Sequence, residues 1–237
     1  VDGLFVSNFA GKTPFAAINL IMPLLMILGA FGFMIGTGGT AVVAKTLGEG
    51  KPDLANSYFS MLIYFAIIGG VVLVIFGQIL LKPVAALLGA EGDMLINCIL
   101  YGRIILLALP FFLIQNVFQS FFIAAEKAKL GLAVIVIAGV TNIILDALFI
   151  IVFKWGLAGA AIATAISQVI GGIIPIVYFG RKNDSLLRLV KTKFYGKILG
   201  KTVVNGSSEM MSNISASVVT TLYNLQLLRL AGEDGVA

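Results

Sequence analysis

Residues 131–153 read GLAVIVIAGVTNIILDALFIIVF, a run of apolar residues that contains a single ionisable side chain, Asp146. A helix rises about 1.5 Å per residue, so a run of this length crosses the roughly 30 Å hydrocarbon core of a bilayer. The run shows no sustained alternation of apolar and polar residues, and backbone amides in hydrocarbon must be satisfied within a helix or a closed barrel. The stretch therefore predicts a membrane-spanning helix that carries one acidic residue.

The rest of the chain repeats this pattern. Hydrophobic residues make up 59% of the 237 residues and charged residues 11%, whereas soluble domains have about 45–50% and about 25%. A water-soluble domain is therefore excluded, and we predict an all-α, polytopic transmembrane helical bundle of about six to seven spans. The other predicted spans are 15–46, 54–81, 94–124, 157–179 and 203–231, and residues 1–10 are typical of the end of another.

Composition also excludes several classes of function. The chain has no histidine and one cysteine, Cys98, which removes the commonest metal ligand and any intramolecular disulfide. The net charge of +5 comes from basic residues in short stretches between apolar runs, without the interleaved aromatics of a nucleic-acid surface. We expect no enzyme activity, no cofactor and no nucleic-acid partner, and membrane lipid as the surroundings.

Lysine and arginine are distributed unevenly between the two sets of connections. By the positive-inside rule, the richer set lies in the cytoplasm of a protein of the plasma or inner membrane. The richer set holds Lys45, Lys51, Lys127, Lys129, Arg181, Lys182, Arg188, Lys191, Lys193, Lys197 and Lys201, and the poorer set holds Lys12, Lys82, Lys154 and Arg229.

Residues 181–202 form the longest connection. Their apolar positions Leu187, Val190, Phe194 and Ile198 have helical spacing, which predicts a cytoplasmic, basic, amphipathic linker on the inner membrane surface. A basic linker held inside by charge alone is the alternative. Either interpretation divides a first transmembrane bundle, 1–180, from the first helix of a second bundle, 203–237. Because the sequence opens inside an apolar segment without an initiator methionine, we expect a piece of a longer protein.

Three ionisable residues fall inside predicted spans: Asp2, Asp146 and Glu209. Each costs about 2.5–3.5 kcal/mol on insertion, which makes it a functional candidate. Glu209 lies close to the start of its helix among polar residues, and its role stays open. Asp2 precedes the predicted outer end at Ala10 by eight residues, and Asp146 precedes Lys154 by eight. Both therefore lie roughly 12 Å below the outer surface.

Two uncharged polar residues are expected at the same place. Asn142 is one turn from Asp146 on the same helical face, and Thr164 reaches a similar depth on the next helix. We predict that Asp2, Asn142, Asp146 and Thr164 face a common polar cavity as a coupling site. Two carboxylates in such a cavity can share a proton, or the same oxygens can coordinate sodium. Asn142 and Thr164 acting only as hydrogen bonds between helices is the alternative.

Glycines mark a further feature of the second predicted helix. Gly29, Gly32, Gly36 and Gly39 repeat every three to four residues and so form one stripe. Small residues in such a stripe let another membrane helix approach closely.

The order and spacing of several short motifs resemble those of the amino-terminal half of the multidrug and toxic compound extrusion (MATE) family. The motifs are VDGLFV at 1–6, GGTAVVA at 38–44, GEG at 48–50, LLGA at 87–90, TNIILD at 141–146 and GLAGAAIAT at 156–164. The resemblance implies a transporter of twelve helices in two related bundles, of which this chain holds the first bundle and the first helix of the second. The missing second half is then its partner.

The resemblance also implies a function. It assigns Asp2 and Asp146, assisted by Asn142 and Thr164, to the coupling site of an antiporter that exports cationic or amphipathic drugs in exchange for protons or sodium. The chain departs from the pattern in its last helix, where some members carry a deeper acidic residue. The alternatives are a lipid-linked oligosaccharide flippase of the same wider superfamily, a membrane-embedded aspartyl protease and a scaffold. A flippase needs basic residues in its cavity, and the protease pattern Gly-x-Gly-Asp is absent.

Overall fold

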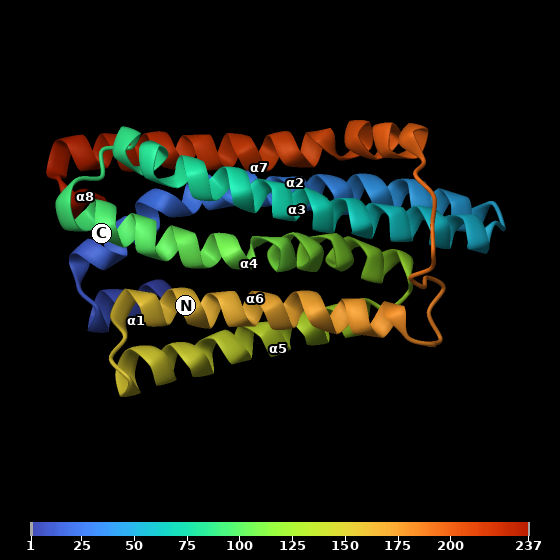
Figure 1. The fold of residues 1–237 in the computed structure, drawn as a ribbon, viewed down its shortest axis with the longest axis horizontal. Coiled ribbons are helices and arrows are strands. Elements are labelled where there is room, and N and C mark those ends of the chain that lie inside the picture. The colour runs from blue at the N-terminus through green and yellow to red at the C-terminus, as the bar shows by residue number, and fades with distance from the viewer. Residues whose placement is uncertain (1, 237) are drawn as a thin grey trace.

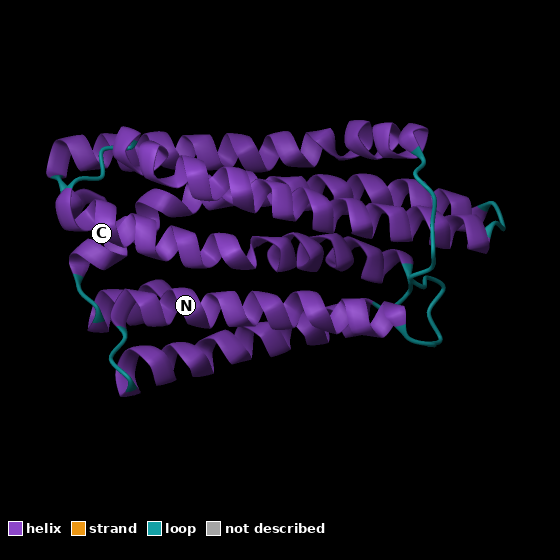
Figure 2. Cartoon of the chain, in the orientation of Figure 1, coloured by secondary structure: helices purple, strands orange, loops and turns teal. Residues whose placement is uncertain are grey.

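The computed structural model describes residues 2–236 as a bundle of helices (Figure 1). No strand occurs in this range (Figure 2), so the predicted all-α membrane fold is confirmed. Val1 and Ala237, which belong to the first and last predicted segments, lie outside the described residues. The elements are α1 (Asp2–Phe9), α2 (Lys12–Gly48), α3 (Pro52–Leu87), α4 (Gly92–Ala124), α5 (Ala128–Asp146), η1 (Ala147–Val152), α6 (Gly156–Gly180), α7 (Gly196–Ala231) and α8 (Glu233–Val236).

Five helical segments of the described chain are long and apolar enough to cross a membrane: α2, α3, α4, α5 continued by η1, and α6. The sixth predicted crossing, 203–231, lies within α7, which has the necessary length but is not among these five. Serine, asparagine and glutamate side chains in its first half lower its hydropathy. In Figure 1, α7 runs along one side of the bundle and the α5 and α6 pair along the other, with α4 between them.

The glycine stripe on α2 is where α4 packs, as predicted. A Cβ atom added to Gly32 would lie 3.0 Å from the Cα of Leu113, and one added to Gly36 would lie 3.1 Å from the Cα of Val117. A side chain at either position would therefore push the two helices apart. Hydrocarbon provides no hydrophobic force between helices, so such close van der Waals contact is a main source of their association.

A second pair of glycines brings α2 and α7 together. A Cβ atom on Gly38 would lie 2.0 Å from the carbonyl oxygen of Thr202, and one on Gly206 would lie 2.0 Å from the carbonyl oxygen of Met34. No side chain fits at such distances, so the backbones touch at this crossing. Further along, the Asn224 amide donates to the Asn19 carbonyl oxygen at 2.6 Å. The helix predicted to begin a second bundle is thus held against the first.

The helix expected from the apolar stripe in residues 181–202 is wrong for residues 181–195, whereas Ile198 does lie in a helix. Residues 181–195 form an extended strap without helix, and α7 begins at Gly196. Side chains of α3 take the hydrogen bonds that a helix would use: Asn56 accepts from the backbone N–H of Arg188 and Ser60 from that of Val190, both at 2.8 Å. Figure 1 shows the strap passing from α6 to α7 across one end of the bundle.

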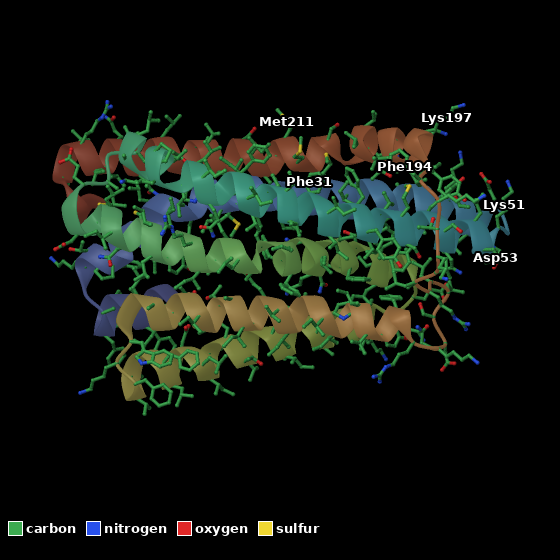
Figure 3. The ribbon with its side chains drawn as sticks, in the orientation of Figure 1. Phe31, Lys51, Asp53, Phe194, Lys197 and Met211 are labelled. Atoms are coloured by element: carbon green, nitrogen blue, oxygen red, sulfur yellow. The ribbon has the colours of Figure 1, made fainter. Side chains whose placement is uncertain are left out.

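The strap lies at the end of the bundle that carries the richer basic set, which we call the basic end. Lys51, Phe194 and Lys197 are labelled there in Figure 3. Leu187 is fully buried in the strap, whereas Phe194 is 73% exposed. The strap is therefore anchored on α3 at some positions and presents other side chains to its surroundings.

Because α2 and α7 cross so closely, adding one methyl group at the crossing should greatly lower the stability of the chain. Gly206→Ala should lower the thermal unfolding midpoint of the chain, because overpacking costs about 1–3 kcal/mol. Gly200→Ala, six residues earlier on α7, is the matched control: no atom lies within 4 Å of its added Cβ. The control should be neutral or slightly stabilising, since alanine favours helix. Equal midpoints for the two variants would contradict the close crossing.

Candidate functional site

Three of the four predicted site residues form a hydrogen-bonded chain across three helices. The Asn142 amide on α5 donates to the Thr164 hydroxyl on α6 at 3.2 Å, and that hydroxyl donates to the Asp2 carboxylate on α1. Each helix is positioned for this by short connections at the end of the bundle opposite the basic end. Asp2, Asn142 and Thr164, which were expected at similar depths, are therefore in contact in the structure.

Asp146 is placed differently from the other three. Its side chain is 0% exposed and accepts no hydrogen bond of good geometry from residues 2–236, but the Asp2 carboxyl lies within reach of it. It interacts electrostatically with the carboxylate of Asp2. It ends α5 where the chain continues into the π-helical turn η1, a conformation that is frequent at functional sites.

The site also contains Tyr101, a residue that the sequence analysis missed. Tyr101 is 0% exposed on α4, its side chain lies within reach of the Asp2 carboxyl, and it interacts electrostatically with both aspartates. The position of Tyr101 in the sequence could have indicated it, because Tyr101 is nine residues beyond Gly92, where α4 begins. The same depth argument that selected Asp2 and Asp146 applies to it.

A cavity of about 590 Å³ opens beside this cluster. Asp2, Asn142 and Thr164 line it, but Asp146 does not, so the expectation that all four face one cavity holds for three of them. Tyr101 and Gln168 also line it. Gln168 follows Thr164 by four residues, and this spacing on one helical face was a second available signal. No lysine or arginine is found among the described residues of its wall.

A second pocket, of about 390 Å³, lies between α2 and α7. Its polar side chains are uncharged amides and hydroxyls, among them Asn213, Ser217 and Asn224. Asn19 and Met22 on α2 line both this pocket and the larger cavity. The two spaces therefore share a wall, and a ligand in one is close to the other.

Glu209 lies outside both spaces. It is exposed on α7, where it accepts a hydrogen bond from the Asn213 amide at 3.3 Å, and it lines neither the cavity nor the pocket. The structure thus separates Glu209 from the acidic pair Asp2 and Asp146.

A family model and curated relatives indicate the same family for this chain. The family model MatE matches residues 1–148, more than half of the chain. The multidrug export protein MepA of Staphylococcus haemolyticus is 32% identical over 188 residues, which cover 79% of this chain and 41% of that protein. MepA of Staphylococcus saprophyticus is 29% identical over 224 residues, which cover 94% and 50%. The chain spans about half the length of the curated relatives it matches.

Solved structures share the fold. An inward-facing conformation of a multidrug resistance MATE family transporter of the MOP superfamily superposes with a TM-score of 0.94 at 24% identity, over 99% of this chain and 54% of that chain. A MOP superfamily transporter from Pyrococcus furiosus superposes with a TM-score of 0.88 at 24% identity, over 99% and 52%. The helical arrangement is therefore that of one half of these molecules.

The Thr164 hydroxyl is expected to stabilise the site. Thr164→Val keeps the shape but removes the donor to Asp2, so stability should fall by about 1–2 kcal/mol, measured by thermal unfolding in detergent. Ser167→Ala is the matched control on the same cavity wall, because the Ser167 hydroxyl donates only to the Thr164 backbone carbonyl of its own helix. A Thr164→Val loss no larger than that of the control would show that the link to Asp2 contributes nothing.

Proposed function

The chain belongs to the MatE family, a family of multidrug efflux transporters and not of enzymes, and on that premise we propose that it forms half of a secondary antiporter. It is a multi-pass protein of the cell membrane. In the proposal, the whole transporter exports cationic or amphipathic drugs in exchange for protons or sodium. Asp2, Asn142, Asp146 and Thr164 form its coupling site.

The observation that carries this proposal is the buried carboxylate of Asp146. An ionised carboxylate away from water costs far more than a neutral group unless it is paired, and the group within reach of Asp146 in the described part of the chain is another carboxyl, that of Asp2. The neighbouring charge on Asp2 adds repulsion. A bound proton or cation removes this cost. The site is therefore suited to loading an ion and releasing it again.

Coupling follows from the contacts of Asp2. The Asp2 carboxylate lines the cavity and is linked through Thr164 to Asn142, while the same carboxylate repels Asp146. A proton or sodium ion at the pair neutralises charge that otherwise attracts a cationic drug into the cavity. Loading the ion from outside then weakens drug binding and favours release outward.

The lining of the cavity supports a cationic or amphipathic substrate. Apolar side chains such as Ile18 and Phe112 lie beside Asp2 and uncharged amides, and the described wall has no basic residue. A pyrophosphate group of a lipid-linked sugar would need lysine or arginine there. The flippase alternative is therefore not supported by this cavity.

Removing the buried charge tests the coupling role. In the full-length transporter reconstituted in liposomes, Asp146→Asn should reduce drug export driven by a proton or sodium gradient by about tenfold or more, because the site can no longer exchange an ion. Asp93→Asn is the matched control, since Asp93 is an exposed acidic residue in the first turn of α4. Export by the control should match the unmodified transporter, and both variants should reach the membrane in normal amounts.

Separate gradients identify the ion. Export that follows the pH gradient alone assigns a proton, and export that follows the sodium gradient alone assigns sodium. Undiminished gradient-driven export by Asp146→Asn would remove Asp146 from the coupling site, and failure of that variant to fold would make its role structural.

A further inference from the structure

A groove of about 460 Å³ lies where α6 meets the strap at the basic end. Its aliphatic wall is formed by Ile173, Ile174 and Val177, and its rim carries Arg181 and Lys182. Tyr178 and Asn183 also line it. Its volume falls in the range of about 300–1,000 Å³ that is usual for ligand sites. The groove thus combines an apolar surface with two cations at one end.

The two cations have no partner in the protein. Neither the Arg181 guanidinium nor the Lys182 ammonium makes a salt bridge or a side-chain hydrogen bond with a residue in the range 2–236. Their backbone, in contrast, is held in place, because the Asn183 amide donates to the carbonyl oxygens of Tyr178 and Arg181 at 2.7 and 3.0 Å. The rim is therefore an ordered turn that presents unpaired positive charge.

The charge around the rim remains positive when neighbouring groups are included. Asp184 is exposed on the same turn, but Arg181, Lys182 and Arg188 outnumber it. Arg188 donates to the Asn183 carbonyl oxygen at 3.0 Å, which keeps its guanidinium near the turn. The rim is thus complementary to an anion.

The two exposed aliphatic residues of the groove lie on another side of α6 than the cavity beside Asp2. Ile173 and Val177 follow Thr164 by nine and thirteen residues, which places them about 180° and about 220° around the helix from it. Thr164 lines the cavity, whereas Ile173 and Val177 are 43% and 41% exposed on the other side of α6. An exposed aliphatic side of a membrane-spanning helix is expected to meet lipid.

We propose that the groove is a binding site for an anionic phospholipid of the predicted cytoplasmic leaflet. The phosphate contacts Arg181 and Lys182, and an acyl chain lies along Ile173 and Val177. A soluble anion would leave this aliphatic wall uncovered. The bound lipid ties the start of the strap, and with it the connection to α7, to the membrane. The proposal does not depend on the transport function.

A polar pocket on the same strap supplies the control. It has about 400 Å³ and is lined by Ser57, Lys191, Thr192, Lys193 and Tyr195. It contains two lysines but no aliphatic wall for an acyl chain. Loss of its lysines changes the charge of the strap by the same amount without touching the groove.

Quenching of tryptophan fluorescence by brominated lipids measures binding at the groove. Trp155 is the single tryptophan of the chain and lies at the opposite end of α6, 50% exposed. The probe is therefore Ile173→Trp in a Trp155→Phe background, reconstituted as the full chain in vesicles of phosphatidylcholine and phosphatidylglycerol. Brominated phosphatidylglycerol should bind at the probe about fivefold or more tightly than brominated phosphatidylcholine, as expected for one or two basic residues at an anionic lipid.

Three comparisons decide the outcome. The unmodified chain, read at Trp155, should show no such preference. Arg181→Gln with Lys182→Gln in the probe background should abolish the preference, whereas Lys191→Gln with Lys193→Gln should keep it within about twofold. Equal binding of the two lipids at the probe, or equal loss in both double variants, would overturn the proposal, because the basic end would then attract anionic lipid only through its overall charge.

Discussion

Hydrocarbon offers no hydrogen bonds, and this constraint determines both the helices and the placement of charge in this molecule. Backbone groups are satisfied within helices that are long enough to cross the hydrocarbon core, and most ionisable side chains are found at the two ends of the bundle. Asp2 and Asp146 are among the exceptions, and Asp146 is fully buried beside the Asp2 carboxyl. Keeping such a carboxylate charged is costly, so binding a proton or cation to it strongly changes the energy of the site.

Close helix packing places that group beside its partners. Glycines on α2 let α4 and α7 approach until backbone atoms meet, while polar contacts between α1, α5 and α6 create the cavity next to Asp2. Asn19 and Met22 separate this cavity from the pocket between α2 and α7. Asp2, which lines the cavity, is therefore separated by one shared wall from the pocket where the first bundle meets α7. This arrangement is suited to linking ion occupancy to movement between bundles.

The sequence predicts the helices and much of the site, because depth in a membrane can be counted in residues. The counting from Ala10 and Lys154 correctly anticipates that Asp2, Asn142 and Thr164 meet, but the coupling role of these residues stays a prediction. The spacing of apolar residues wrongly predicts a helix in residues 181–195. Asn56 and Ser60, on a helix far away in the sequence, accept hydrogen bonds from the strap backbone instead. The spacing also cannot show that Asp146 does not line the cavity, because this depends on how side chains of separate helices pack. The basic residues of the strap are visible in the sequence, but the groove beneath Arg181 and Lys182 is not.

The most direct measurement is the number of protons and sodium ions released when tetraphenylphosphonium, a permanent cation, binds to the full-length transporter. Calorimetry in buffers of different ionisation enthalpy counts protons, and a sodium electrode counts sodium. The account predicts that the unmodified transporter releases one of the two ions and that Asp146→Asn binds the cation without releasing either. Equal release by both proteins would contradict the account.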